Sequence, residues 1–178
     1  MPGARASDNA GKGIGKMTKR TRRTHSAAFK AKVALAAVVD WASRKILAHR
    51  VAITREATHA VEALEEAFAR YGLPDIVNTD QGSQFTADAF TDAVLGRQVQ
   101  LSMDGKGAWR DNVFIERVWR SIKYEEVYLK AYESVSHARR SIGDYIDLYN
   151  RRRPHSSLAD RTPDEAYFAT LPAIKSAA

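Results

Sequence analysis

The sequence is 178 residues long, with 44% hydrophobic and 28% charged residues, so it can build one sizeable core and leaves little room for a second domain. It has no cysteine, which excludes a disulfide scaffold and a thiolate metal site and fits a reducing cytoplasm. No run approaches the roughly 18 apolar residues of a membrane span, and the first residues lack the apolar region of a secretory signal, so we expect neither.

The net charge of +7 is concentrated in the N-terminal part of the chain. Residues 1–32 contain nine Lys or Arg and a single acid, Asp8, whereas residues 33–178 are close to neutral. Residues 1–26 have no hydrophobic period and predict a disordered basic arm. Such an arm would attract nucleic acid through counterion release, although a tail that is merely solvated has the same composition.

Two short apolar runs follow the arm, at residues 32–40 and 45–53. Their length and their β-branched residues predict two strands, joined into a hairpin by a turn at residues 41–44. The alanine-rich first half of the first run fits a helix equally well.

Helices and strands are expected to alternate after the hairpin. The predicted helices are residues 54–71, 86–95, 112–129 and 134–152, and the predicted strands are residues 75–79 and 98–103, with a glycine-rich loop at residues 104–110. We expect the strand at residues 75–79 to be buried, Leu95 to face inward with Phe90 and Val94, and Ser134 to cap the last helix. Strands alternating with helices predict an α/β fold with a mixed sheet.

Two carboxylates stand out by their positions. Asp80 ends a predicted strand, and ligands of open α/β sheets gather at the carboxyl ends of strands. Glu116 lies near the start of the third predicted helix, where Asn112, Arg120 and Lys123 fall within about 60° of it around the axis. Carboxylates that bind a divalent cation beside Arg and Lys would suit a phosphodiester. Taken singly, Glu116 and Arg120 also fit a solvated salt bridge, and the Asp80 segment also fits a simple turn.

Several stretches carry a joint pattern. They are VDWASR at residues 39–44, TDQGSQF at 79–85, SMDGKG at 102–107, DNVFIERVWRSIK at 111–123, Tyr149-Asn150, Arg153-Pro154-His155 and TPDEAY at 162–167. Thirty-five residues separate Asp80 from Glu116, and Lys123 follows Glu116 by seven. The chain from about Val38 to Tyr167 thereby resembles the integrase-like catalytic core of bacterial insertion-sequence transposases, specifically insertion-sequence family three, with its acid–35–acid spacing.

The resemblance implies a ribonuclease-H-like fold, a mixed sheet flanked by helices, in which three acids hold two Mg²⁺ or Mn²⁺ ions. Such a pair of ions activates the attacking oxygen and stabilises the leaving oxygen as DNA is cut and joined. By match, Asp80 is the second metal ligand, Glu116 the third and Lys123 the contact to element-end DNA, with Asn112 and Arg120 as supporting or phosphate-binding groups. The implied partners are DNA and either further copies of the chain or an intact transposase, in the bacterial cytoplasm at the nucleoid, with no membrane.

One expected segment is missing. The first catalytic Asp of the family lies on a strand upstream of Val39, but this sequence has no acid between Asp8 and Asp40. Residues 22–37 instead resemble the start of the family's other, upstream-frame protein, so we expect an internal deletion and a sheet without its first strand. The expected organisation is a basic arm over residues 1–37, a truncated core over 38–170 and a tail over 171–178.

Loss of that strand predicts impaired cutting and joining, because two carboxylates hold a hard cation less well than three. Asp40 is the acid that could take the place of the missing ligand. It lies on the neighbouring strand, however, and its counterpart in the family is not catalytic. The alternative functions are an inactive remnant that binds DNA or an intact transposase, and a product with no role. Basic residues of the last helix, Arg139, Arg140 and 151–153, fit either a contact surface or a solvated helix end.

The glycine-rich loop is a further candidate for contact with DNA. Residues 105–107 and Trp109 fit the wall of a DNA channel, and Trp109 fits a core position equally well.

Overall fold

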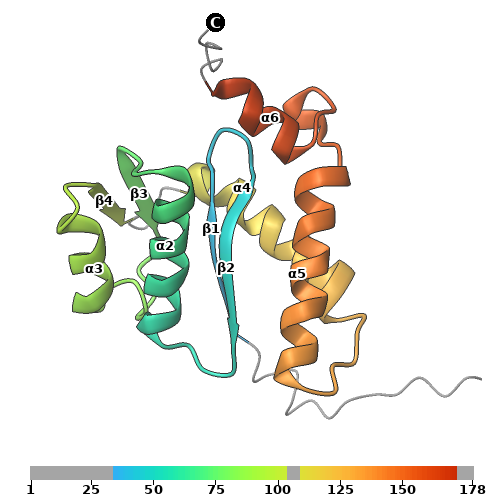
Figure 1. Cartoon of the computed structure of the whole chain (residues 1–178), viewed down its shortest axis with the longest axis horizontal. Coiled ribbons are helices and arrows are strands. Elements are labelled where there is room, and N and C mark those ends of the chain that lie inside the picture. The colour runs from blue at the N-terminus through green and yellow to red at the C-terminus, as the bar shows by residue number, and fades with distance from the viewer. Residues whose placement is uncertain (1–33, 104–108, 172–178) are drawn as a thin grey trace, which may run out of the picture.

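The computed structural model describes residues 34–103 and 109–171, with side chains from residue 113 onward in the second range (Figure 1). Its strands are β1 (Ala34–Val39), β2 (Ile46–Ala52), β3 (Ile76–Thr79) and β4 (Gln100–Met103). Its helices are α2 (Ala57–Tyr71), α3 (Asp88–Leu95), α4 (Trp109–Ser121), the π-helix η1 (Ile122–Val127), α5 (Val135–Arg152), the short η2 (Ser156–Leu158) and α6 (Pro163–Thr170).

The first two strands form the predicted antiparallel hairpin, in which Ala34 pairs with Ala52 and Val39 with Ile46. The alanine-rich run is therefore a strand and not a helix, because its backbone is hydrogen-bonded along β2. The Asp40 side chain holds the turn: its carboxylate accepts hydrogen bonds from the Ser43 backbone N–H at 2.8 Å and from the Ser43 hydroxyl at 2.6 Å.

The second sheet is the parallel pair β3–β4, connected through α3. Among the described residues no strand joins β1–β2 to β3–β4, which fits a mixed sheet without its expected first strand. The expectation that residues 75–79 are buried is wrong. Ile76 is 45% exposed, because β4 is the only strand that pairs with β3 within the described ranges.

Two apolar clusters hold the elements together. One lies between the hairpin, α4, η1 and α5 and includes Ile46, Val118 and Ile142; the other, between α2, α3 and β4, includes Leu64 and Val94. Figure 1 shows α2 and α5 on either side of the hairpin. The prediction that Leu95 faces inward is wrong. Leu95 is 55% exposed, because it lies about 100° around the helix from the fully buried Val94.

The long helix predicted for residues 112–129 is two segments. It begins at Trp109 as α4 and continues from Ile122 as the π-helix η1, where the Tyr128 N–H donates to the Lys123 carbonyl at 2.8 Å. Val118, Ile122 and Glu126 are all buried and are spaced by four residues, which exceeds the 3.6-residue repeat of an α-helix. The wider turn keeps this stripe facing α5.

The C-terminal helices are anchored by polar contacts. The Ser134 hydroxyl accepts the His137 N–H at 3.0 Å, so the predicted cap of α5 is confirmed. Further along α5, the buried Asn150 amide donates to the Ile46 carbonyl at 2.9 Å and accepts the Ile46 N–H at 3.0 Å. These two bonds fasten α5 to the start of β2.

Candidate active site and nucleic-acid interface

Asp80 directly follows β3 and is held in a turn. Its Oδ1 accepts the Gly82 N–H at 2.8 Å, and the Gly82 carbonyl accepts the Phe85 N–H at 2.9 Å. A Cβ at Gly82 would lie 2.8 Å from the same carboxylate oxygen, so the close approach favours glycine there. The exposed carboxylate is therefore oriented by the turn, while its Oδ2 makes no hydrogen bond within the described part of the chain.

Glu116 lies on the exposed side of α4. The carboxyl ends of the parallel strands β3 and β4 meet at one edge of their sheet, and Asp80 follows the first strand while α4 comes after the second. Asp80 therefore lies at this edge, and residues 104–108, which join β4 to α4, lie outside the described part of the chain. The alternative interpretation of Glu116 and Arg120 as a salt bridge finds no support, since the ion pairs among the described residues do not include this pair.

The donor set for a pair of divalent cations is incomplete in the described ranges. No group of three His, Asp or Glu side chains there could hold a metal ion. Asp40, the first acid in the described part of the chain, directs its carboxylate to Ser43 in the hairpin turn. These residues do not fit a three-carboxylate site.

The exposed face of α4 and η1 is cationic. Arg117, Arg120 and Lys123 are exposed and form no ion pair with any described side chain. The Asn112 and Trp109 side chains and the loop at residues 105–107 lie outside the residues whose side chains are described. Of the predicted DNA contacts, the structure therefore describes Arg120 and Lys123 and places both on one exposed surface.

The neighbouring acids of η1 are engaged by α5. The Glu125 carboxylate accepts hydrogen bonds from Arg153 and from the Tyr145 hydroxyl, and the bond from Arg153 lowers the pKa of Glu125. Glu126 is 2% exposed and accepts from Ser141 at 2.6 Å and from Tyr132 at 3.1 Å. These contacts were not predicted, because most of them join residues that are 15 or more positions apart in the sequence.

Lys130 completes the partners of Glu126, with its Nζ 2.9 Å from the carboxylate. Burial, followed by the nearby Glu126 charge, raises the pKa of the Tyr132 hydroxyl. Tyr132 is thereby kept protonated and able to donate. With both acids of η1 compensated, Arg117, Arg120 and Lys123 outnumber the exposed acid Glu116 and give this face a net positive charge.

The hairpin turn packs on the first half of α4. The Trp41 and Phe114 rings meet edge to face with centroids 4.6 Å apart, and the Arg44 guanidinium lies 4.1 Å from the Phe114 ring centre. Burial lowers the pKa of Arg44. These contacts set the position of α4 relative to the hairpin.

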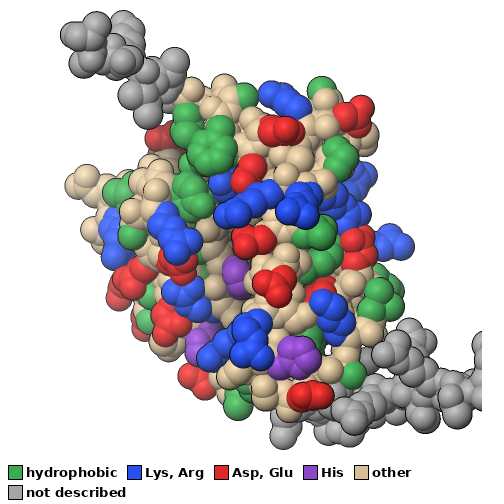
Figure 2. Space-filling view, turned by 45° about the vertical axis from the view of Figure 1, so that its right-hand side comes forward, with side chains coloured by type: hydrophobic (Ala, Val, Ile, Leu, Met, Phe, Trp, Pro, Cys, Tyr) green, Lys and Arg blue, Asp and Glu red, His purple; other side chains and the backbone are tan. Residues whose placement is uncertain are grey.

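The basic residues of α5 are largely used within the chain. Arg139 donates from Nε to the Val51 carbonyl at 2.9 Å, Arg153 binds Glu125, and Arg151 lies 3.9 Å from Asp164. Figure 2 shows Lys, Arg, Asp and Glu side chains interspersed on this side of the molecule. The expected contact surface on α5 is thus reduced to Arg140 and Arg152, which form no ion pair within the described residues.

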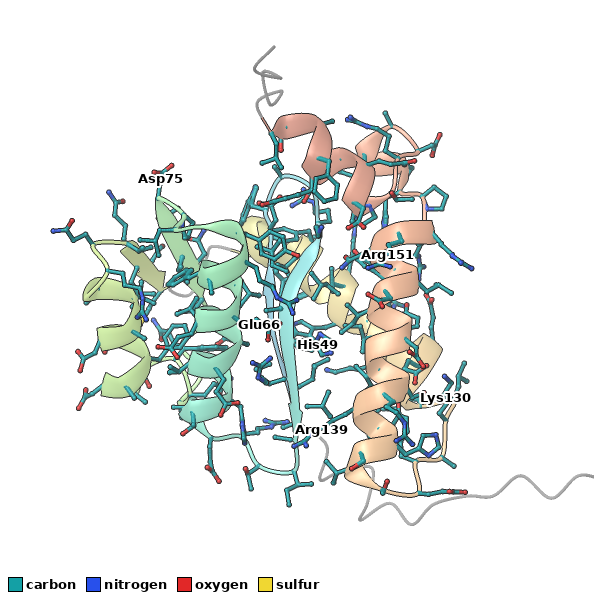
Figure 3. The ribbon with its side chains drawn as sticks, in the orientation of Figure 1. His49, Glu66, Asp75, Lys130, Arg139 and Arg151 are labelled. Atoms are coloured by element: carbon teal, nitrogen blue, oxygen red, sulfur yellow. The ribbon has the colours of Figure 1, made fainter. Side chains whose placement is uncertain are left out.

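A groove of about 340 Å³ runs between β2, α2 and α5 (Figure 3). His49 and Glu66 face it, and Glu66 binds both Arg50 and Arg70. Burial lowers the pKa of His49, and the hydrogen bond from Arg50 lowers that of Glu66. The charges that line the groove compensate one another, which is typical of a contact that stabilises the fold.

None of the helices in residues 34–103 and 109–171 combines the length and the apolar character that crossing a membrane requires.

The fold is ribonuclease-H-like and is shared with the catalytic cores of retroviral integrases. The bovine immunodeficiency virus (BIV) integrase core domain superposes with a TM-score of 0.60 at 19% identity, covering 78% of this chain and 87% of that one. The HTLV-2 integrase core domain, solved with magnesium in a trimeric form, gives 0.55 at 16% identity, covering 75% and 90%. At these identities the likeness shows the fold alone.

The chain belongs to the integrase core domain family. One model of that family matches residues 17–108, more than half of the chain, and a second matches residues 97–163. The predicted kinship with insertion-sequence transposases is confirmed by two relatives.

InsK of insertion sequence IS150 from Escherichia coli K12 is 26% identical over 137 residues, which cover 75% of this chain and 48% of that protein. The transposase of IS904 from Lactococcus lactis is 34% identical over 91 residues, covering 51% and 36%. The chain thus spans about half the length, or less, of the relatives that it matches.

Proposed function

We propose that this chain is a transposase-type integrase core that binds DNA along the exposed face of α4 and η1, and whose cutting and joining of DNA is impaired. One observation carries the proposal: α4 and η1 carry an exposed cationic face, on the same helical segment as Glu116. Arg117, Arg120 and Lys123 have no ionic partner among the described side chains, whereas Asp80 and Glu116 lack a third acid.

The cationic face suits a phosphodiester backbone. An arginine can bind a phosphate through two N–H groups and a lysine through a compact point charge, and both release condensed counterions from DNA. The basic residues of the N-terminal arm add sequence-independent attraction of the same kind. Binding is therefore expected to depend strongly on salt and weakly on sequence.

The impaired chemistry follows from the donor set. Mg²⁺ and Mn²⁺ favour oxygen ligands, and Asp80 and Glu116 are the carboxylates that the family resemblance assigns to them. With Asp40 committed to Ser43, the described acids supply two ligands where the family uses three. Weak metal binding and little or no strand cutting are the expected result.

The partner that we propose beside DNA is a second copy of the chain or an intact transposase. The HTLV-2 core domain, whose fold this chain shares, was solved in a trimeric form. An inactive core that retains its fold and its DNA-binding face could compete with the intact protein for the same ends.

The binding half of the proposal is tested by fluorescence anisotropy with a labelled duplex. The double variant Arg120→Ala/Lys123→Ala is expected to bind about tenfold more weakly at fixed salt, because two phosphate contacts are lost. Arg140→Ala/Arg152→Ala on α5 removes the same charge from the other exposed surface and is the matched control. Equal losses in both double variants would contradict a binding face on α4.

The catalytic half is tested by nicking of supercoiled plasmid with Mn²⁺, with Glu116→Gln as the control. Little or no nicking by either protein is expected. Metal-dependent nicking by the natural sequence that disappears in Glu116→Gln would show a working site and overturn the proposed impairment.

A further inference from the structure

Two tyrosines extend the cationic face of α4 beyond Lys123. Tyr124 is 61% exposed and Tyr128 is 51% exposed, and their rings meet at 90° with centroids 5.2 Å apart. Aromatic rings of this size are costly to leave in water, and they are enriched where one side of a ring contacts a ligand. Neither tyrosine belongs to the apolar clusters that hold the fold together.

Arg120 and Lys123 lie near Tyr124 on the same segment. The Arg120 guanidinium lies 5.8 Å from the centre of the Tyr124 ring, and Lys123 precedes Tyr124 in the chain. The two acids of the same segment are compensated by α5, because Glu125 binds Arg153 and Glu126 is buried. The surface around the rings therefore combines flat aromatic faces with positive charge, which is complementary to the bases and phosphates of a nucleic acid.

The backbone that carries the two rings is anchored in the core. Ile122 and Glu126 are buried on the opposite side of the same π-helix, and the Tyr128 N–H closes its wide turn on the Lys123 carbonyl. Single π-turns of this kind occur frequently at functional sites. Because the inner side is anchored in the core, the rings need little ordering when a ligand binds.

We propose that Tyr124 and Tyr128 form a stacking site for one unpaired base of single-stranded DNA, with Arg120 and Lys123 binding the adjoining phosphates. Two rings at a right angle cannot both lie parallel to the same base, so the base stacks on one ring and places its edge against the other. Bases inside a duplex are already stacked and cannot enter this corner. The inference deepens the proposed function, since it names the form of DNA that this face prefers.

The test compares three labelled DNAs in anisotropy titrations: a duplex, the same duplex with a short unpaired tail, and the tailed duplex with abasic nucleotides in the tail. The natural sequence is expected to bind the tailed duplex about tenfold more tightly than the other two, because the unpaired base adds a stacking contact with the rings. Tyr124→Ala is expected to abolish that preference while leaving duplex affinity within about twofold. Tyr124→Phe keeps the aromatic face and should keep the preference.

Controls separate the possible failures. Leu129→Ala removes another exposed apolar side chain of the same region and should leave the preference unchanged, and thermal melts of each variant verify folding. Equal affinity for tailed and abasic-tailed DNA, or an undiminished preference in Tyr124→Ala, would overturn the stacking site even if Arg120→Ala/Lys123→Ala still weakens duplex binding. If Arg120→Ala/Lys123→Ala instead binds the duplex as tightly as the natural sequence, the proposed function is overturned. A change of oligomeric state in Tyr124→Ala without loss of the tail preference would identify the tyrosines as a protein interface and also overturn the stacking site.

Discussion

The two sides of the segment formed by α4 and η1 differ in how their charges are used. On the side facing α5, Glu125 and Glu126 each bind a cation and a hydroxyl from elsewhere in the chain. On the other side, Glu116, Arg120 and Lys123 are exposed and make no ion pair with the described residues. The difference teaches that charge in the sequence does not identify a binding site; an exposed charge without an internal partner is the better indicator.

The largest expected effect is on the inner side. Glu126→Ala removes the acceptor of the Tyr132 and Ser141 hydroxyls inside the core, and it should lower the free energy of unfolding by about 3 kcal/mol because buried donors lose their partner. Urea denaturation measures the change. Glu116→Ala on the outer side is the matched control and should change stability by no more than about 0.5 kcal/mol. Similar losses in both would remove the distinction between the two sides.

The next effect concerns the attachment of α5 to the hairpin. Asn150→Ala deletes both hydrogen bonds to Ile46 and leaves a buried backbone donor and acceptor unpaired, so we expect a loss of about 2 kcal/mol. Asn150→Asp keeps the acceptor but buries a carboxylate against the Ile46 carbonyl, so it should lose at least as much stability as Asn150→Ala. Urea denaturation of the three proteins gives the order, and a harmless Asn150→Ala would mean that apolar packing alone holds α5 in place.

On the outer side the expected change is in DNA affinity and not in stability. Lys123→Ala should bind duplex DNA a few-fold more weakly and reduce the slope of log affinity against log salt by about one, since one phosphate contact is lost. Titrations at several salt concentrations measure that slope, and thermal melts should coincide with those of the natural sequence. A large drop in melting temperature would show that Lys123 has a structural role that the exposed position does not suggest.

The smallest effect is a dependence of stability on pH that comes from two histidines, His49 on β2 and His155 after α5. Burial lowers the pKa of His49 and of His155 below the ordinary value of 6.5, so folding favours their neutral forms. Their contribution to stability is complete above pH 6.5 and is lost as the pH falls from 6.5 through their folded-state pKa values, because the unfolded chain then binds more protons. Melting temperatures between pH 8 and pH 5 should fall less in His49→Gln, whereas Lys123→Ala should leave the slope unchanged.

Much of the fold could be predicted from local patterns. The hairpin, the helices α2 and α5 and the Ser134 cap follow from spacing and from local hydrogen bonding, which depend on neighbours in the chain. Other features depend on distant partners. Ile76 is exposed because β3 pairs with β4 alone within the described residues. The π-turn at η1 reflects the fit of Ile122 and Glu126 against α5.

The candidate site divides in the same way. The spacing of Asp80, Glu116 and Lys123 was sufficient to predict kinship with insertion-sequence transposases, and family membership is confirmed. The spacing did not single out Tyr124 and Tyr128, since an aromatic pair at helical spacing fits a core equally well. Their exposure became visible only with α5 packed on the opposite side.

The sequence by itself determined the order of the elements, the family and the residue types available for chemistry, because these depend on short-range periodicity and on motifs. The tertiary structure decided which charges are free to meet a ligand. Glu125, Glu126, Arg139 and Arg153 are charged in the sequence just as Glu116, Arg120 and Lys123 are. Contacts with Val51, Ser141 and Tyr145, the Arg153–Glu125 pair and the local Lys130–Glu126 pair engage the first group, whereas the second group forms no ion pair among the described residues.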